Sequence, residues 1–350
     1  MRFGAYALPS YHADTDGSPG EFMRQLVDLL ASAEPLGFDA IWLNEHHFHA
    51  FGGMIPSPPM MLSALAQRTQ RVTLGTSITV LPLHNPVELA EQLAMLDLMS
   101  DGRLQLGIGR GSVGYDHAAL GLTYHDAQER MIDGLQVIMK AWSGRPFSHH
   151  SPFYNFADLS VWPPGQQQPA PPIWISCSRS PASFEWTGRR GFNLLTVGFI
   201  NTVARTAELT RIYRDASDEP SACEIGTLYH VVVAENGRRA REQALGAFRR
   251  FRVEMAGAHA RNKAGEDDVM PVNVANSLNV DQLIDEGRLI AGNPDEVADM
   301  FRYLQGEIGF TEVELMFQLG GLSFEVAYES MQLFATEVMP SLRQPASVPA

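Results

Sequence analysis

The stretch DAIWLNEHHFH (residues 39–49) joins a short apolar run to a dense polar cluster, and the segments around it repeat this plan. Before it, residues 2–8 form an apolar run that predicts a strand, followed by a segment with helical spacing. After it, residues 58–68 have the spacing of a second helix and residues 72–77 form a third strand. The first helix is expected to bury Phe22, Leu26, Leu29, Leu30 and Ala33 on one face and to end at Gly37.

The alternation of strands and helices continues through the rest of the chain. A third helix is predicted to start at Asn85-Pro86, because asparagine caps helices and proline is favoured at the first helical position. A later helix carries Met131, Leu135, Ile138, Met139 and Trp142 after a long glycine-rich loop. Further strands are predicted at residues 103–108, 173–177, 194–197, 228–234 and 311–319. Eight strand–helix units favour an α/β fold of the (β/α)8 TIM-barrel type with insertions.

The segments without clear periodicity are expected to be connections within one barrel domain that spans residues 1–350. Residues 163–172 are rich in proline and glutamine, which is typical of a surface connection. The region near residues 259–290 contains the least patterned part of the chain, and we interpret it as an insertion over the barrel mouth.

Composition excludes several classes of protein. Of the 350 residues, 45% are hydrophobic and 19% are charged, which is ordinary for a globular domain with a sizeable core. The 26 basic and 40 acidic residues give a net charge of −14, and no basic run could follow a nucleic acid backbone or an anionic membrane. Cys177 and Cys223 form no CxxC pattern, and no apolar run is long enough to span a membrane. We therefore expect a cytoplasmic protein.

The polar cluster after the second strand is the strongest candidate for a catalytic site. In a parallel barrel, reacting groups lie on the loops that follow the strands, and Glu45 and His46 stand at such a position. Histidine is the usual acid or base near neutral pH. Two other interpretations remain: His47 and His49 could be a metal-binding pair of alternate residues, or the histidines could be ordinary loop residues. Because no further ligands follow in a metal-binding pattern, the sequence predicts no metal site.

The loop after the fourth strand is rich in glycine and contains one arginine. Residues 109–114 match GxGxxG, but this match is weak, since a dinucleotide site would open a helix at once and residues 115–124 have no clean helical face. Gly109 would instead allow close approach of the backbone, and Arg110 offers several donors to an anion such as phosphate. The alternative is a tight turn beside a solvated arginine.

The segment after the fifth strand suggests a binding site for phosphate. Residues 178–183 (SRSPAS) lead into a helix, and helix N-termini bind anions through their free amide groups. Taken alone, this segment could be only a helix cap. Together with Arg110 and Arg130, however, it would gather basic and hydroxyl groups at one barrel mouth, as a phosphate-bearing cofactor requires.

These residues together resemble the bacterial luciferase-like flavin monooxygenases, and the likeness extends over nearly the whole chain. No single motif is diagnostic, but their order and spacing agree with the family. The matching motifs are Gly37-Phe38-Asp39, Trp42-Leu43, Glu45-His46-His47-Phe48, Gly75-Thr76, Val80-Leu81-Pro82, His84-Asn85-Pro86, Leu98-Met99-Ser100-Asp101-Gly102-Arg103, Gly107-Ile108-Gly109-Arg110-Gly111, Glu185-Trp186, Arg190-Gly191, Gly292-Asn293-Pro294-Asp295-Glu296-Val297, Leu333-Phe334 and Val338-Met339-Pro340.

The resemblance implies a monooxygenase that uses O2 and reduced FMN, with the FMN supplied by a separate flavin reductase. It also implies a homodimer formed through helices outside the barrel, at the helices after the second and third strands. His46 matches the family's histidine beside the flavin ring, with Glu45 as its neighbour in the motif. A cysteine precedes the matched arginine in the luciferase itself, whereas this chain has Gly109, which argues against light emission.

The resemblance further implies the residues that hold the cofactor. Ser77-Ile78 matches the place of a non-proline cis peptide bond beneath the flavin ring. Phosphate contacts are implied for Arg110, Arg130, Ser180 and Ser183, and backbone contacts to the cofactor are implied at Arg179.

Alternative functions and the identity of the substrate stay open at this point. The alternatives are a deazaflavin-dependent hydride-transfer enzyme of the same superfamily, a flavin-binding protein without turnover, and a metal-dependent hydrolase. Apolar residues near the expected mouth indicate a small apolar substrate, although such a cluster is also typical of a core. They are Phe48, Phe51, Met54, Met60 and Met61.

Overall fold

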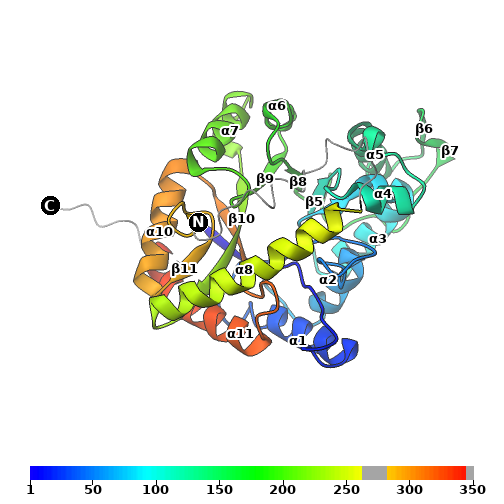
Figure 1. The fold of residues 1–350 in the computed structure, drawn as a ribbon. Helices are drawn as coiled ribbons and strands as arrows, with labels where there is room; N and C mark the ends of the chain where they lie inside the picture. The colour runs from blue at the N-terminus through cyan, green and yellow to red at the C-terminus, as the bar shows by residue number, and fades with distance from the viewer. Residues whose placement is uncertain (262–281, 344–350) are drawn as a thin grey trace.

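Eight parallel strands form a closed barrel inside a ring of helices in the computed structural model, which describes residues 1–261 and 282–343 (Figure 1). The barrel closes because β12 pairs with both β10 and β1, and β10 also pairs with β9. This confirms the predicted (β/α)8 barrel. Its strands are β1 (Arg2–Ala7), β2 (Ala40–Leu43), β3 (Thr73–Thr76), β5 (Leu104–Gly109), β8 (Ile173–Ser176), β9 (Asn193–Val197), β10 (Ile225–Val233) and β12 (Glu312–Met316).

The barrel strands are buried because helices cover their outer face and side chains fill the inside. All nine residues of β10 are buried, as is typical of parallel strands. Inside the barrel, the rings of Trp42 and Trp174 meet edge to face at a centroid distance of 5.5 Å. Gly75 makes room for Trp42, because a Cβ atom at position 75 would lie 2.1 Å from the indole. This packing fills the centre of the barrel with side chains.

The predicted helices form between the strands, and several start at the expected cap residues. The Asn85 side chain accepts a hydrogen bond from the Val87 amide at the start of α3, which confirms the predicted cap. The helices are α1 (Pro19–Ala31), α2 (Pro58–Ala66), α3 (Pro86–Met99), α5 (Ala127–Ala141), α6 (Pro181–Arg189), α7 (Val203–Asp215), α8 (Gly237–His259), α10 (Pro294–Ile308), α11 (Phe324–Leu333) and α12 (Met339–Arg343), with shorter turns η1 (Leu81–Leu83), η2 (Tyr124–Asp126), η3 (Pro220–Ala222) and η5 (Phe334–Val338).

Some elements were not predicted from the sequence. They are the antiparallel hairpin of β6 (Phe147–His150) and β7 (Asn155–Leu159), the short strands β4 (Thr79–Val80) and β11 (Ile290–Gly292), and the helix α4 (Gly114–Ala119). The helix α4 corrects the expectation that the glycine-rich segment after β5 stays a loop. Much of the predicted insertion near 259–290 lies outside the described residues, since the structure describes nothing between 262 and 281.

None of the helices in residues 1–261 and 282–343 is long and apolar enough to cross a bilayer.

Candidate active site

A cavity of about 730 Å³ opens at the carboxyl ends of the barrel strands. Its wall is made by loops that lie far apart in sequence and meet only because the barrel closes. Most of the predicted site residues line it, which agrees with the rule that parallel barrels carry their sites at this end. These lining residues are Glu45, His46, Ser77, Ile78, Gly109, Arg110, Arg179, Ser180 and Ser183.

Glu45 is a buried carboxylate held by groups from two segments. Its Oε1 atom lies 2.8 Å from His84 Nε2 and 3.0 Å from His47 Nε2, and its Oε2 atom accepts a hydrogen bond from the Val80 amide at 3.1 Å. Burial alone would raise the pKa of Glu45, but the two imidazoles lower it to about 2. Glu45 is therefore ionised at neutral pH and fixes the loop after β2 against the segment after β3.

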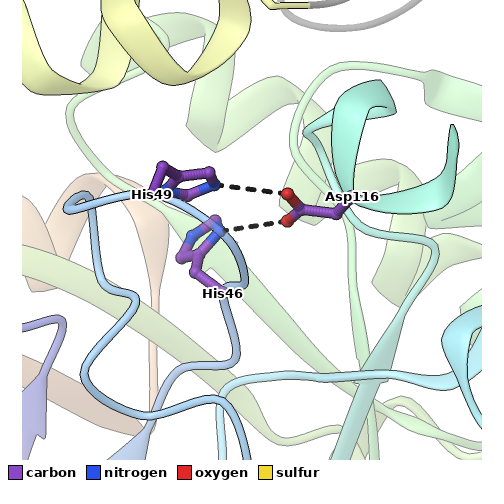
Figure 2. A group of neighbouring side chains, drawn as sticks. All are labelled: His46, His49 and Asp116. Atoms are coloured by element: carbon purple, nitrogen blue, oxygen red, sulfur yellow. Dashed lines mark ion pairs between the residues drawn. The ribbon is translucent and has the colours of Figure 1, made fainter. Parts of the chain in front are cut away.

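His46 follows Glu45 and lies beside a second imidazole and a carboxylate. His46 Nδ1 is 4.0 Å from Asp116 Oδ2, and His49 Nε2 is 3.3 Å from Asp116 Oδ1 (Figure 2). Burial, reinforced by the neighbouring His49 and His259, lowers the pKa of His46 to about 3. The imidazole of His46 is therefore neutral at neutral pH.

The structure places His49 beside His46 and not beside His47, contrary to the metal-binding pair weighed from the sequence. That pair assumed that residues 47 and 49 continue a strand and point the same way. However, β2 ends at Leu43, and Phe48 adopts a left-handed backbone conformation with φ 61°. The chain therefore turns between the two histidines, and His47 contacts Glu45 instead.

The peptide bond between Ser77 and Ile78 is cis, as the resemblance implied. The Ser77 hydroxyl donates a hydrogen bond to Glu314 Oε2 at 2.7 Å, which ties this segment to β12. Ile78 packs against Gly109, where a Cβ atom would lie 2.3 Å from Ile78 Cδ1. Glycine at position 109 is thus required for Ile78 to occupy its place in the cavity wall.

The N-terminus of α6 contributes hydroxyl and cationic groups to the same cavity. Ser180 is the N-cap residue of α6, but its side chain makes no capping hydrogen bond. Arg179 Nη2 is buried without a hydrogen-bond partner in the described part of the chain. Arg110, which also lines the cavity, stacks over the Tyr124 ring at 5.2 Å. An unpaired buried guanidinium nitrogen next to a helix N-terminus fits an anionic group such as phosphate.

Arg130 is not among the residues that line the cavity. It lies on α5, with its guanidinium over the rings of Phe153 and Tyr154 at 5.4 and 5.1 Å. Its contact with a cofactor phosphate therefore stays a prediction.

The apolar part of the wall differs from the expected set of residues. Of the five apolar residues named from the sequence, Phe51 alone lines the cavity, whereas Phe48 and Met60 are exposed at the surface. The wall is formed instead by residues from distant elements, and Phe251 of α8 lies 5.3 Å from Phe51 and 5.9 Å from Phe199 between ring centroids. Sequence reasoning had missed Phe199, Phe251, Met255 and Met316, and also Asp116 and His259.

Of these missed residues, Asp116 is the one that the sequence could most easily have indicated. It lies six residues after Arg110, in a segment already placed beyond the end of a barrel strand, so a search of that segment for ionisable groups would have found it. The residues of α8 do not lie directly after the end of a barrel strand, so their sequence position does not indicate a site. They line the cavity because α8 packs against it.

Comparisons with known proteins agree with this architecture. The family described as luciferase-like monooxygenase matches residues 1–312. The chain is 27% identical to the oxygenase component of a flavin-dependent trigonelline monooxygenase from Acinetobacter baylyi, over 98% of this chain and 96% of that protein. The crystal structure of the monooxygenase RslO1 from Streptomyces bottropensis has a TM-score of 0.87 and 28% identity, and covers 97% of this chain and 99% of its own.

A third comparison concerns the fold alone. The oxygenating constituent of 3,6-diketocamphane monooxygenase from Pseudomonas putida, solved in complex with FMN, has a TM-score of 0.78 at 19% identity. The match covers 99% of this chain and 100% of the other.

Proposed function

The chain belongs to the luciferase-like monooxygenase family, and on that premise we propose that it oxygenates a small, apolar organic substrate with reduced FMN and O2. One oxygen atom of O2 enters the product and the other leaves as water, while reduced FMN and the substrate together provide the electrons. A separate flavin reductase supplies the reduced FMN. The relative from Acinetobacter baylyi is itself described as an oxygenase component, which supports a system of two proteins, an oxygenase and a reductase.

The observation that carries this proposal is the set of residues that line the cavity at the carboxyl ends of the strands. A cationic and hydroxyl-rich group, formed by Arg110, Arg179, Ser180 and Ser183, lies on the same cavity as the cis peptide at Ser77 and Ile78. The cationic and hydroxyl group would hold the FMN phosphate. The cis peptide would lie against the flavin ring, and Gly109 leaves room for Ile78 at this place. The orphaned Nη2 atom of Arg179 would gain a partner on binding.

The other residues of the wall would position the reaction and exclude water. When bound, reduced FMN supplies the electrons that activate O2. His46 would contact the reacting groups through a ring nitrogen, and Glu45 would hold the loop that carries His46. The rings of Phe51, Phe199 and Phe251 would cover the reaction from solvent and accept an apolar substrate.

Binding of FMN and riboflavin to alanine variants tests the proposed cradle for the phosphate. A charge-assisted contact contributes about 1.5 to 3 kcal/mol, so Arg110→Ala or Arg179→Ala should weaken FMN by roughly 10- to 150-fold. Riboflavin lacks the phosphate and should bind both variants and the unaltered protein about equally. Equal losses for both ligands would indicate misfolding, and no loss for either would contradict the cradle. Arg130→Ala tests in the same assay whether the predicted contact of Arg130 exists.

Direct assays separate this function from the alternatives. Tighter binding of a deazaflavin than of FMN would favour hydride transfer. Oxygen consumption that stops after one equivalent of reduced flavin, with every substrate of a broad panel, would favour a binding protein. Hydrolysis that depends on an added metal would favour a hydrolase.

We also infer that the protein forms a homodimer through α2 and α3. These neighbouring helices expose large apolar side chains: Met60 on α2 is 75% exposed and Met95 on α3 is 52% exposed, with Leu98 and Met99 beside it. Exposed apolar patches of this kind are characteristic of protein interfaces.

A further inference from the structure

Two imidazoles and one carboxylate converge at the wall of the cavity from separate parts of the chain. His46 and His49 lie in the loop after β2, and Asp116 lies in α4 (Figure 2). One donor atom from each residue lies within 4.8 Å of the other two. The three side chains are nearly buried, with exposed fractions of 14%, 5% and 6% in the same order.

Donor atoms on two members of this cluster, His49 and Asp116, lack ordinary hydrogen-bond partners among the described residues. Among the described residues, both ring nitrogens of His49 and the Oδ1 atom of Asp116 are buried without one. His49 Nε2 and Asp116 Oδ1 are 3.3 Å apart, yet their geometry does not meet that of a hydrogen bond. Because buried polar atoms are almost always paired, unpaired atoms that face one another indicate that a ligand binds between them.

We propose that His46, His49 and Asp116 form a binding site for one divalent transition metal ion of the Zn²⁺ type. Two imidazole nitrogens and one carboxylate oxygen are the ligand set of many open zinc sites. Donors bound to one ion at about 2.0–2.2 Å lie roughly 3 to 3.5 Å apart. The 3.3 Å separation already has this value, and small side-chain rotations would shorten the 4.0 Å separation between His46 and Asp116.

The residues around the cluster indicate which class of ion it would bind and which way the open coordination position would point. Mg²⁺ and Ca²⁺ prefer oxygen ligands, of which this cluster offers one residue only. The nearby carboxylate of Glu45 is occupied by His47 and His84 and does not belong to the set. His46 and Asp116 line the cavity, so the open coordination position would face it. Coordination through His46 Nδ1 would leave Nε2 of the same ring for another partner.

Titration of the flavin-free, chelator-treated protein with Co²⁺ tests the site, because cobalt bound to nitrogen and oxygen ligands has a characteristic visible absorption. We expect saturation at one Co²⁺ per chain and displacement by Zn²⁺. His49→Ala and Asp116→Asn, which alter ligands from different segments, should each weaken binding by at least roughly tenfold. The matched control is His150→Ala, which removes an exposed imidazole on β6. Thermal unfolding of each variant shows whether it is folded.

Three results would overturn the site. They are no absorption change in the unaltered protein up to about 1 mM Co²⁺, binding that survives both ligand variants, or binding lost only in His150→Ala. The first result needs no variant, so a variant that fails to fold leaves the proposal testable. The Co²⁺ titration uses flavin-free protein, and the FMN and riboflavin assays use protein treated with a chelator to remove metal ions. Failure of the metal site and failure of the proposed oxygenase function are therefore distinguishable.

Discussion

His46 is the residue whose removal separates cofactor binding from turnover. Because it lines the cavity without belonging to the phosphate cradle, His46→Ala should leave the FMN dissociation constant within about tenfold of its original value. Oxygenation should fall by roughly 10² or more, the usual scale for losing one positioned donor or acceptor. Product formed per reduced FMN, measured with a substrate found in a panel, checks this. Equal turnover in both proteins would remove His46 from the catalytic residues.

Glu314 makes the stability of the barrel depend on pH. Burial raises its pKa well above the ordinary value of 4.5, although the hydrogen bond from Ser77 opposes this. Between 4.5 and the raised value, the folded state holds a proton that the unfolded state has released. The free energy of unfolding therefore falls as pH rises through this window, by at most about 1.4 kcal/mol per pH unit.

Glu314→Gln removes this titration while keeping a polar side chain of similar size. We expect the free energy of unfolding of the variant, relative to the unaltered protein, to increase as pH is raised above about 5. Urea unfolding at several pH values measures the difference. Glu325→Gln, at an exposed position on α11, serves as the control. A constant difference between the two proteins at all pH values would show that Glu314 does not titrate in this way.

Individual site residues could be predicted where a strand end brings them to the mouth, and could not where a turn decides their direction. Glu45, His46 and Arg110 line the cavity because each lies at or just beyond the end of a barrel strand. The approach of His49 to Asp116 depends on the backbone turn at Phe48, which no periodic pattern encodes.

At the scale of elements, the position of α6 depends on its close approach to α7. A Cβ atom at Gly188 of α6 would lie 2.2 Å from the carbonyl oxygen of Tyr213 in α7. Gly188→Ala should therefore lower the free energy of unfolding by about 1 to 3 kcal/mol, the usual cost of overpacking. It should also weaken FMN binding, because the displaced helix carries Ser180 and Ser183. Denaturant unfolding and FMN titration measure the two effects.

A second glycine provides the matched control. Gly306 lies at an exposed position within α10, and a Cβ atom there would meet nothing within 4 Å. Gly306→Ala should raise the free energy of unfolding by about 0.5 to 1 kcal/mol, because alanine loses less backbone freedom on folding. If both variants behaved alike, the packing of α6 against α7 would not explain the loss.

Elements with local signals were predictable, whereas those stabilised by their surroundings were not. The start of α3 follows from Asn85 and Pro86 alone. The β6–β7 hairpin contains the polar run Ser148, His149 and His150, which has no strand-like alternation, and its pairing becomes visible only in the folded chain. The short strand β4 likewise exists because it lies beside β5.

For the whole molecule, the exposed surface of α2 and α3 predicts the state of assembly. Light scattering at micromolar concentration should give a mass near twice that of one chain. The double variant Met60→Glu, Met95→Glu should give the mass of one chain, because buried carboxylates without partners oppose association. Tyr303→Glu, at a 52% exposed position on α10, should leave the mass unchanged. A single-chain mass for the unaltered protein would contradict the dimer.

The pairing of β1 with β12 has a consequence for synthesis on the ribosome. Arg2 in β1 bonds to Glu312 in β12, 310 residues further along the chain. At about 5 to 20 residues per second, the first strand waits roughly 15 to 60 s for this neighbour. During that time the nascent barrel is an open sheet, and one side of β1 presents unpaired backbone groups to other chains. Protection of this edge by chaperones should therefore raise the fraction of newly made protein that avoids aggregation, whereas slower synthesis would lengthen the time for which the edge is exposed.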